Sequence, residues 1–596
     1  MHVIATAGHV DHGKSTLVRL LTGMEPDRWA EERRRGLTID LGFAWTTLPG
    51  RGEVAFVDVP GHERFVPNML AGVGPVPAVM VVVAADEGWM PQSAEHVAAL
   101  DALGVRHGLL VVSRSDLADP EPARRQALAE LARTSLGRVP SVVVSGLTGR
   151  GLPELRAALE RLVDTLPPAD PAADVRLWVD RSFSIRGAGT VVTGTLPGGT
   201  LRVGDELELS RTGQRVRVRG LQTLGREVDR VTAVARVAVN LRGVDREAVS
   251  RGDALLTPGA WPTTEVVDVA LRGDEDLPRM LVLHVGAAAV PARVRPLRTG
   301  TARLVLSRAL PLRVGDRALL RDPGRHRIAA GVEVLDTAPP AFTRRGAARA
   351  RAAELAEALA RSGPERQVAL ATLRLRHQGI VPTRELRAAG LPEVGTAVAP
   401  GWRADPERWA HLVARAAEEV DGWQRAHPLD PGIPEEVLRQ RLGLLDGTVL
   451  RALADAAGLV PRAGRLGQPG ATRALPPEVT RALCAVEADL RAHPFRAPEA
   501  DRLAELGLDP VRLAAATRAG LLLKVTDGVY LLPGADARAV EVLAELPQPF
   551  TVSQARRALD TTRRVAVPLL ELLDRQHRTV RLADGTRQVR NVPQDG

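Results

Sequence analysis

The feature that most constrains the fold is a short glycine-containing segment near the amino terminus. Residues 8–15 read GHVDHGKS and directly follow an apolar run, residues 3–7, that is typical of a buried strand. The segment fits the P-loop pattern, in which a tight turn joins a strand to a helix. Its backbone N–H groups and the positive end of the helix dipole attract phosphate oxygens. The sequence therefore predicts a phosphate-binding domain at the start of the chain.

Two side chains of this loop are expected to act on the nucleotide. Lys14 is one of only two lysines in a chain that otherwise uses arginine, which indicates that the site requires a lysine. Lys14 would reach the β- and γ-phosphates, and the Ser15 hydroxyl would ligate Mg²⁺. The loop residues expected to bind the nucleotide are Gly8, Val10, Asp11, His12, Gly13, Lys14, Ser15 and Thr16.

Short apolar runs alternate with amphipathic stretches over the first 165 residues. The predicted strands are residues 3–7, 54–57, 78–85, 108–112 and 141–144, and helical patterns lie at residues 92–103 and 152–162. This alternation is typical of a doubly wound α/β domain with a parallel sheet. Ligands of such domains bind outside the carboxyl ends of the strands.

Two later segments complete the predicted phosphate and metal site. Thr38, in the first switch segment (residues 35–39, RGLTI), would complete the Mg²⁺ shell only when a γ-phosphate is present. Asp58 closes a predicted strand and would hold Mg²⁺ through water, while the Gly61 N–H would contact the γ-phosphate. His62 then stands where a group that orients the attacking water belongs.

The sequence predicts that the bound base is guanine. Asp116 follows the predicted strand at residues 108–112, and its carboxylate can accept two hydrogen bonds from the N1–H and exocyclic amine of guanine. Adenine cannot supply that pattern, so GTP and GDP are the expected ligands. The residues expected around the base are Ser113, Arg114, Asp116, Ser145, Gly146 and Leu147, the last three offering a backbone N–H to the guanine O6.

The P-loop string, the switch threonine and residues 58–62 together resemble the translational GTPases related to elongation factor Tu. This sequence departs from that family in two places. Ser113 and Arg114 stand where the family has Asn or Thr followed by Lys, and Gly146 stands where it has Ala. Arg114 can still stack along the base, but Ser113 loses reach, so we expect altered guanine affinity with specificity kept by Asp116.

After a proline-containing linker at residues 167–171, the pattern changes to short alternating strands with glycine turns. Predicted strands lie at residues 177–185, 189–196, 205–209 and 216–221, and a second set spans residues 264–335. Regular short strands of this kind predict two closed antiparallel barrels. In the relatives of elongation factor Tu, two such barrels grip the aminoacyl end of a tRNA.

Parts of the first barrel resemble the selenocysteine-specific elongation factors. The resemblance rests on Asp180 and Arg181, on residues 187–194 (GAGTVVTG) and on residues 236–240 (RVAVN). It implies that Asp180, Arg181 and Arg236 line a pocket for the selenocysteinyl group. A selenol is mostly ionised at neutral pH, so two guanidinium groups would favour it through charge-assisted hydrogen bonds.

The chain beyond about residue 343 is rich in arginine and alanine and reads as short helices, each set followed by a glycine turn and two brief strands. This pattern predicts four tandem winged helices. In the last one, residues 553–559 and 562–576 read as a helix-turn-helix, with a wing turn at residues 584–585. Residues 563–571 (RRVAVPLLE) resemble the terminal winged helix of bacterial selenocysteine-specific factors, which implies binding of an mRNA hairpin. The candidate RNA contacts are Arg563, Arg564, Arg575, Arg578, Arg581 and Arg587.

The predicted protein is thus multidomain: an α/β P-loop GTPase domain, two antiparallel β-barrels and then tandem α+β winged helices. The expected domain ranges are 1–170 for the GTPase, 171–262 and 263–342 for the barrels, and 343–415, 416–475, 476–535 and 536–596 for the winged helices.

Composition limits the remaining possibilities. The formal net charge of +9 and an isoelectric point near 10.8 point to polyanionic partners. The sequence contains no apolar run of transmembrane length and no coiled-coil segment, so we expect a cytoplasmic monomer. Its single cysteine, Cys484, excludes an intramolecular disulfide and is expected to be a buried structural thiol.

The resemblance implies a factor that binds GTP with Mg²⁺, carries selenocysteinyl-tRNA to the ribosome at a UGA codon marked by an mRNA hairpin (SECIS), and hydrolyses GTP there. Two alternatives stay open. A general elongation or initiation factor with another aminoacyl-tRNA cargo would leave the C-terminal helices unexplained. A nucleotide-regulated DNA-binding regulator would use the winged helices on duplex DNA and would require dimer-related half-sites.

Overall fold

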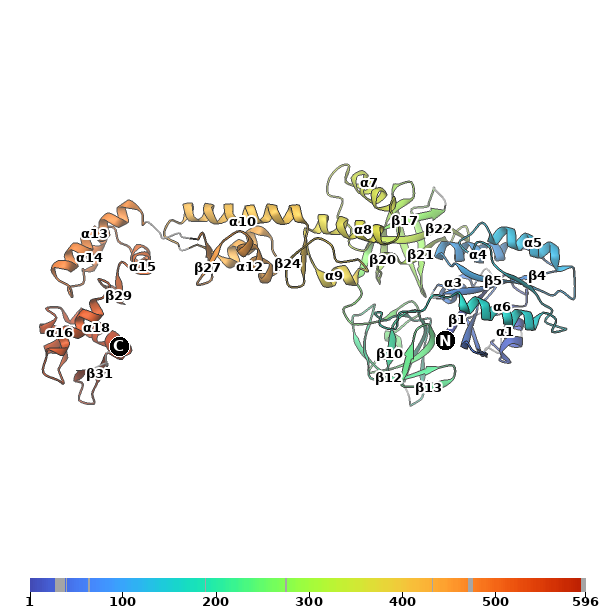
Figure 1. Cartoon of the computed structure of the whole chain (residues 1–596), viewed down its shortest axis with the longest axis horizontal. Helices are drawn as coiled ribbons and strands as arrows, with labels where there is room; N and C mark the ends of the chain where they lie inside the picture. Colours follow the sequence, from blue (N-terminus) through green and yellow to red (C-terminus); the bar gives the residue numbers. More distant parts are fainter. Residues whose placement is uncertain are drawn as a thin grey trace. The chain divides into compact units, whose positions relative to one another are not determined.

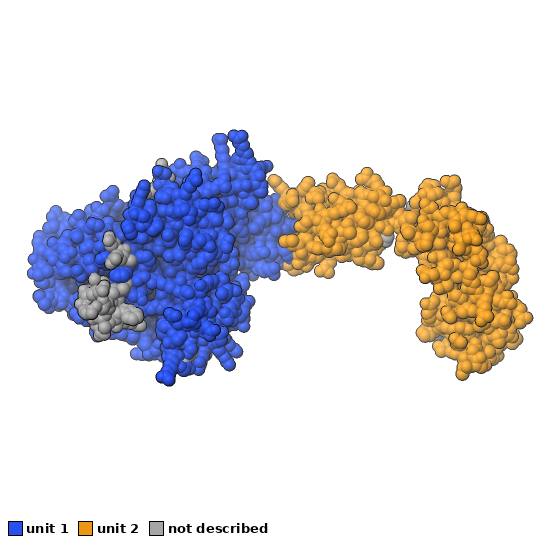
Figure 2. All heavy atoms as spheres, turned by 180° about the vertical axis from the view of Figure 1, so that it is seen from behind, with its two compact units in different colours: residues 1–397, 401–405 blue, residues 398–400, 406–596 orange. Residues whose placement is uncertain are grey.

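The computed structural model describes residues 1–26, 38, 40–62, 65–74, 76–187, 189–273, 276–430, 432–469 and 475–590. The chain forms two compact units, coloured separately in Figure 2: residues 1–397 with 401–405, and residues 398–400 with 406–596. None of the helices within these described ranges is long and apolar enough to cross a membrane.

The first domain is built on a six-stranded sheet in the order β2-β3-β1-β4-β5-β6. Its strands are β1 (His2–Ala7), β2 (Gly42–Leu48), β3 (Gly52–Asp58), β4 (Ala78–Ala84), β5 (His107–Ser113) and β6 (Ser141–Val143). Neighbouring strands are parallel except β2 and β3, which are antiparallel. The predicted parallel sheet is therefore confirmed, with one antiparallel edge strand, β2, that the sequence pattern did not reveal.

Helices cover both faces of this sheet, as predicted for a doubly wound domain. They are α1 (Lys14–Thr22), α3 (Val66–Val73), α4 (Pro91–Leu103), α5 (Pro120–Leu131) and α6 (Leu152–Asp164). One buried cluster joins the sheet to α3, α4 and α5, and a second joins the other face to α1 and α6. Because β1, β3, β4, β5 and β6 run in the same direction, their carboxyl ends meet at one edge.

The next domain is an antiparallel sheet in the order β7-β16-β11-β12-β15-β9-β8, with β13 beside β12. Figure 1 labels β12 and β13 of this domain, which is drawn in green. Its two ends, β7 and β8, are separated only by Val179 and Asp180, and the Asp180 N–H donates to the Thr193 oxygen at 2.9 Å. The sheet therefore curls round on itself, as a barrel requires. Its strands are β7 (Arg176–Trp178), β8 (Arg181–Ile185), β9 (Gly189–Leu196), β11 (Glu206–Leu209), β12 (Arg215–Thr223), β13 (Arg226–Val228), β15 (Ala235–Arg242) and β16 (Ala254–Leu256).

Smaller elements accompany this sheet. The strands β10 (Thr200–Arg202) and β14 (Arg230–Thr232) pair with each other, and a short 3-10 helix, η2, spans Arg246–Ala248. A closed six-stranded barrel then follows in the order β17-β20-β19-β18-β21-β22, which confirms the second predicted barrel. Its strands are β17 (Thr263–Gly273), β18 (Met280–Val285), β19 (Ala288–Arg298), β20 (Thr301–Pro311), β21 (Arg317–Asp322) and β22 (Arg327–Asp336).

The first helical group belongs to the same compact unit as the barrels, except for residues 398–400. It contains α7 (Ala347–Leu359), α8 (Gly363–Gln378), α9 (Thr383–Ala388) and a sheet of β23 (Ile380–Pro382), β25 (Trp402–Ala404) and β24 (Thr396–Ala399). Leu355 and Leu370 of its helices share a buried cluster with Val314 and Leu335 of the closed barrel.

A buried ionic network fastens this group to the barrel. Asp268 of β17 is fully buried and accepts hydrogen bonds from Arg303 Nε at 2.7 Å and from Arg351 Nε of α7 at 2.8 Å. Arg351 also donates to Asp336 at 2.5 Å. Burial by itself would lower the pKa of Arg351, but Asp336 and Asp268 outweigh it and raise that pKa. Two buried carboxylates, Asp268 and Asp336, thus balance the two buried guanidinium groups.

Replacing Asp268 by asparagine is expected to destabilise this unit by about 3–5 kcal/mol, because buried Arg303 loses its carboxylate partner and buried Arg351 loses one of two. Chemical denaturation followed by circular dichroism measures the change. Asp276→Asn removes an exposed acid from the same barrel and is expected to alter stability by less than about 0.5 kcal/mol. Equal effects of the two substitutions would contradict the assigned role.

The second unit begins with a long helix. Its first group contains α10 (Pro406–Ala426), β26 (Ile433–Pro434), α11 (Glu435–Leu442), α12 (Gly447–Ala456), β27 (Val460–Arg462) and β28 (Arg465–Gly467). The domain boundary predicted between residues 415 and 416 falls inside α10. The division at residues 405 and 406 replaces it, since a continuous helix cannot be split between two domains at its middle.

The last two helical groups have the same order of elements. The third contains α13 (Pro477–Ala492), α14 (Ala500–Glu505), α15 (Pro510–Arg518), β29 (Leu523–Thr526) and β30 (Val529–Leu531). The fourth contains α16 (Ala535–Ala544), α17 (Val552–Ala558), α18 (Arg563–Arg575), β31 (Thr579–Arg581) and β32 (Arg587–Val589). The helix-turn-helix and wing predicted in the fourth group agree with α17, α18 and the β31–β32 hairpin.

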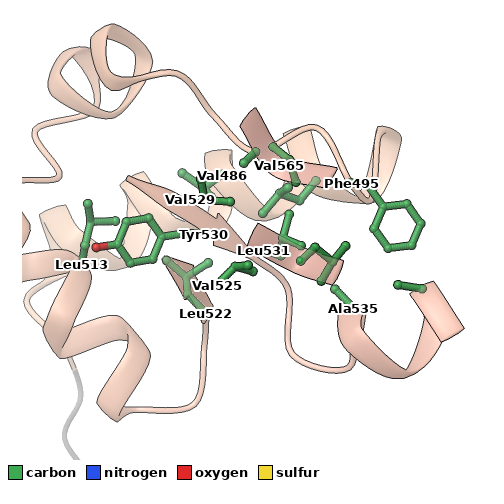
Figure 3. Packing of buried hydrophobic residues seen from close by; sticks show 14 of the residues in the cluster. Val486, Phe495, Leu513, Leu522, Val525, Val529, Tyr530, Leu531, Ala535 and Val565 are labelled. Carbon is green, nitrogen blue, oxygen red and sulfur yellow. The ribbon is translucent and has the colours of Figure 1, made fainter. Parts of the chain in front are cut away.

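A single hydrophobic core spans both of these groups. Phe495 and Val529 of the third group and Val565 of the fourth lie in one buried cluster, which Figure 3 shows from close by. Cys484, on α13, is exposed. The predicted buried thiol is therefore wrong: helix α13 turns its neighbours Leu483 and Val486 towards the core instead.

Candidate functional site

The P-loop residues lie at the carboxyl edge of the sheet, between β1 and α1. Gly8 has a φ of 138°, and a Cβ atom there would stand 2.2 Å from the Val82 oxygen, so only glycine fits. Lys14 is 5% exposed, and its ammonium donates to the carbonyl oxygens of Gly8 at 3.0 Å and His9 at 2.6 Å. The Lys14 ammonium is thus held inside the loop by two of the loop's own carbonyl oxygens.

A histidine that the sequence analysis missed supports this loop. His96 of α4 is fully buried, and its Nδ1 accepts a hydrogen bond from the Gly8 N–H at 3.1 Å. Burial, with smaller effects of the charges on Lys14 and His9, lowers the pKa of His96 to about 3. The ring is therefore neutral, and its lone pair is free to accept that bond. No local motif marks this residue, because the contact joins positions 88 residues apart.

Replacing His96 by alanine is expected to weaken GDP and GTP binding by about 5- to 100-fold, because a buried Gly8 N–H loses its acceptor. Stopped-flow measurement with fluorescent nucleotides gives both affinities. His96→Asn offers an amide oxygen close to the position of Nδ1 and is expected to retain most of the affinity. Equal losses in the two variants would indicate a packing defect rather than a missing acceptor.

Oxygen ligands converge at the predicted metal site. Asp58, at the end of β3, is fully buried and accepts hydrogen bonds from Ser15 Oγ at 2.6 Å and Thr6 Oγ1 at 2.7 Å. Thr38 Oγ1 lies 3.0 Å from Ser15 Oγ. Burial raises the pKa of Asp58, against the hydrogen bond from Ser15 and the charge of Lys14. A buried carboxylate with two hydroxyls suits a hard cation such as Mg²⁺.

The second switch begins beside the P-loop. A Cβ atom on Gly61 would stand 2.5 Å from Lys14 Nζ and 2.7 Å from the Val10 nitrogen, so this glycine allows close approach of the two backbones. His62 follows directly and is half-buried, with its ring 5.9 Å from that of Phe65. Of the first switch segment, only Thr38 lies within the described residues.

The residues predicted around the base also lie at this edge. Ser113 is buried, and its hydroxyl donates to the His12 oxygen at 2.7 Å, so the short side chain still reaches the P-loop. Arg114 donates to Glu87 at 2.8 Å and to the Asp11 oxygen at 2.5 Å. The departures from the family pattern therefore keep the link between the base loop and the P-loop.

Asp116 is exposed and is oriented by its neighbour after β6. The Ser145 hydroxyl donates to Asp116 Oδ1 at 2.5 Å and accepts from the Thr148 N–H at 3.1 Å. A Cβ atom on Gly146 would stand 3.3 Å from Thr16 Cγ2, so an alanine there would require a small shift. Leu147 is 84% exposed.

The three residues predicted for the aminoacyl pocket lie together in the first barrel. Asp180 is almost buried and accepts from Arg236 through both carboxylate oxygens, one contact measuring 2.7 Å. Thr193 Oγ1 donates to the same carboxylate at 2.7 Å. The guanidinium of Arg236 lies 3.9 Å from the ring centre of Phe43, on β2. Asp180 thus holds Arg236 in place.

Arg181 stands between two cavities. A cavity of about 770 Å³ is bounded by Arg181, Phe183 and Arg251, among others, and a smaller one of about 180 Å³ by Arg181 and Arg236. Burial lowers the pKa of Arg251, with Asp40 and Asp180 opposing the change and Arg181 adding to it. The wall of the larger cavity carries three arginines, Arg181, Arg246 and Arg251, and three acids, Asp40, Asp180 and Glu247.

The arginines predicted for RNA binding fall into two sets. Arg563, Arg575 and Arg581 are exposed and Arg578 is half-buried. Arg587 is 4% exposed and donates to Asp574 at 2.9 Å, so the predicted RNA contact at Arg587 is not supported. Arg564 donates to the oxygens of Gly528 and Ala497, both at 3.0 Å, and so joins the last two helical groups.

Four segments match known protein families. Residues 1–165 match the Elongation factor Tu GTP binding domain, and residues 189–256 match Elongation factor Tu domain 2. Residues 264–341 match the beta-barrel domain of the selenocysteine-specific elongation factor, and residues 541–588 match the winged helix of elongation factor SelB. The chain is therefore a translational GTPase that binds guanine nucleotides.

Two relatives and one solved structure carry the same family name. The selenocysteine-specific elongation factor of Desulfomicrobium baculatum is 31% identical and is covered over 99% of both chains. That of Escherichia coli K12 is 39% identical over 57% of this chain and 56% of its own length. The crystal structure of a bacterial selenocysteine-specific elongation factor, EF-Sec, superposes with a TM-score of 0.81 at 25% identity and covers 99% of this chain and 100% of that chain. This chain belongs to the family of selenocysteine-specific elongation factors.

Proposed function

We propose that this protein binds GTP with Mg²⁺, carries selenocysteinyl-tRNA to the ribosome at a UGA codon marked by an mRNA hairpin, and hydrolyses GTP there. It would act as a monomer in the cytoplasm. The observation that carries the proposal is the cationic pocket of Arg181 and Arg236, which lies directly against the domain that holds the nucleotide.

In the nucleotide site, separate residues would bind the metal ion, the phosphates and the base. Ser15, Thr38 and Asp58 would hold Mg²⁺, which neutralises charge on the β- and γ-phosphates when bound. Lys14 would bind the same phosphates, and Asp116, oriented by Ser145, would select guanine. Each of these oxygen and nitrogen atoms lies at the carboxyl edge of the sheet.

Hydrolysis would depend on His62. This residue follows Gly61, where an added Cβ atom would stand 2.5 Å from Lys14 Nζ, so His62 begins next to the P-loop and its ring would orient the attacking water. The reaction would stay slow until the ribosome fixes the position of that ring, as expected for GTPases that need an activating partner.

The aminoacyl pocket would select by charge. A selenolate can accept charge-assisted hydrogen bonds from Arg181 and Arg236, whereas a neutral seryl hydroxyl accepts only weaker hydrogen bonds from the same two guanidinium groups. Losing two such bonds corresponds to a discrimination of about 10² to 10⁴. Asp180 keeps Arg236 in position without filling the cavity beside it.

The mRNA hairpin would bind to the fourth helical group. Arg563 begins α18, Arg575 ends it, and Arg581 lies on the wing strand β31, so exposed positive charge follows the helix and the wing. Such a surface binds phosphates first, and an RNA loop offers both phosphates and unstacked bases.

Competition binding tests the cargo. Selenocysteinyl-, cysteinyl- and seryl-tRNA made from the same tRNA compete for the full-length protein with a GTP analogue bound. We expect affinities that decrease in that order, with at least about a hundredfold between the first and the last. Equal affinities for all three would overturn the proposal and leave a translational GTPase with another cargo.

A further inference from the structure

The segment that directly follows the first switch, residues 40–43, contacts the selenocysteinyl pocket. Asp40 lies two residues after Thr38, and its Oδ2 is 3.0 Å from Arg181 Nη2. The same guanidinium donates to the Leu41 oxygen, and it lies 5.1 Å from the ring centre of Phe43. The segment between the switch and β2 therefore forms one wall of the pocket and holds Arg181 by charge, by hydrogen bond and by stacking.

The same conformation places Thr38 in the metal site. Thr38 is 8% exposed and stands 3.0 Å from Ser15 Oγ, the other hydroxyl expected on Mg²⁺. Two residues of extended chain span at most about 7 Å. With Asp40 fixed, Thr38 can move by at most about twice this length, roughly 14 Å, so any larger movement out of the metal site must displace Asp40 from Arg181.

A second connection comes from the other switch. Arg251, in the first barrel, donates to Asn68 Oδ1 of α3 at 2.7 Å and to the Pro67 oxygen at 3.4 Å. Its Nη1 also lies 3.8 Å from Asp40 Oδ1. Helix α3 begins four residues after His62, so Arg251 joins the second switch to the same aspartate.

We infer that Asp40, supported by Arg251, is the positioning residue through which the nucleotide state controls the selenocysteinyl pocket. With Thr38 in the metal site, Asp40 and Leu41 fix the guanidinium of Arg181 in the orientation that meets the cargo. When Thr38 leaves, Arg181 loses both partners and the pocket loses an ordered cation. This inference rests on the proposed function.

The charge pattern of the cluster agrees with positioning rather than with simple attraction. Two carboxylates, Asp40 and Asp180, each hold one of the pocket arginines; the Asp180–Arg236 pair is largely buried and the Asp40–Arg181 pair is half-buried. If attraction of a selenolate were the sole requirement, these acids would weaken it. Their presence is explained if a fixed guanidinium binds the anion better than a mobile one, since less side-chain entropy is lost on binding.

The test compares the affinity for selenocysteinyl-tRNA in the presence of a GTP analogue and of GDP, for the full-length protein and for Asp40→Asn. We expect the substitution to reduce the ratio of the two affinities by about 10- to 100-fold, through weaker binding in the GTP-analogue state. Nucleotide affinity without tRNA is expected to change by less than about threefold. Glu227→Gln, which removes an exposed acid from the barrel that carries Arg181, is the control and should leave the ratio unchanged.

The outcomes separate this inference from the proposed function. If the unsubstituted protein selects selenocysteinyl- over seryl-tRNA but Asp40→Asn keeps the full GTP-to-GDP ratio, the positioning role is wrong and the cargo assignment stands. A uniform loss in both nucleotide states would indicate a structural defect and would also overturn the role. Restoration of the ratio by Asp40→Glu would support it, because a longer carboxylate can still reach Arg181.

Discussion

Ribosome-stimulated GTP hydrolysis is expected to fall by about 10² to 10⁴ when His62 is replaced by alanine, the range lost when a positioned group no longer orients or accepts a proton from the reacting water. Binding of GTP and of aminoacyl-tRNA should change little, because His62 belongs to neither contact set. Quench-flow measurement of a single turnover on programmed ribosomes separates the chemical step from binding.

The control for this experiment is His107→Ala. His107 begins β5, at the edge of the same sheet opposite to the nucleotide, and its ring lies 3.3 Å from Thr165 Oγ1. The His107→Ala substitution removes a histidine side chain from the same domain and should leave the rate of hydrolysis within about twofold of that of the unsubstituted protein. A rate in His62→Ala that matches this control would show that another group orients the water.

Replacing both Arg181 and Arg236 by methionine is expected to reduce the preference for selenocysteinyl- over seryl-tRNA by about 10² to 10⁴. Methionine keeps much of the length and removes the charge, so the loss reports on the guanidinium groups. Equilibrium binding of the two charged tRNAs, with a GTP analogue present, measures the preference.

The double substitution leaves buried Asp180 without its arginine partner and could disturb folding. Two further variants distinguish such a defect from a loss of recognition. Arg236→Lys keeps a positive charge beside Asp180 and should restore part of the preference. Arg215→Met with Arg230→Met removes two exposed arginines from the same domain and should leave the preference unchanged. A preference that survives loss of both pocket arginines would place selenocysteine recognition elsewhere.

Much of the fold was readable from the sequence because local patterns carried it. The runs of apolar residues gave β1, β3, β4, β5 and β6 almost to their ends, and alternation with glycine turns gave both barrels. Strand β2 escaped, since at a sheet edge its burial is mixed and no continuous apolar run marks it. The boundary predicted between residues 415 and 416 falls inside α10, whose long amphipathic pattern contains no break.

The candidate site shows the same division. Residues 8–15, Asp58, Asp116 and the pocket arginines belong to short motifs that can be recognised one at a time. His96 and Asp40 belong to none, because their roles arise from contacts between distant segments. Arg587 was predicted to contact RNA because of its charge, but it is buried and donates to Asp574. Sequence alone does not distinguish an arginine that binds a partner from one that closes a core.

The core that runs through the third and fourth helical groups has a practical consequence for how the RNA-binding end can be isolated. Phe550, Leu569 and Leu573 of the last group lie in the same cluster as Val486, Phe495 and Leu531 of the group before it. A fragment cut near residue 535 would expose both halves of that cluster to water. The segment that matches the SelB winged helix, residues 541–588, is thus smaller than the piece expected to fold cooperatively, which begins near residue 475.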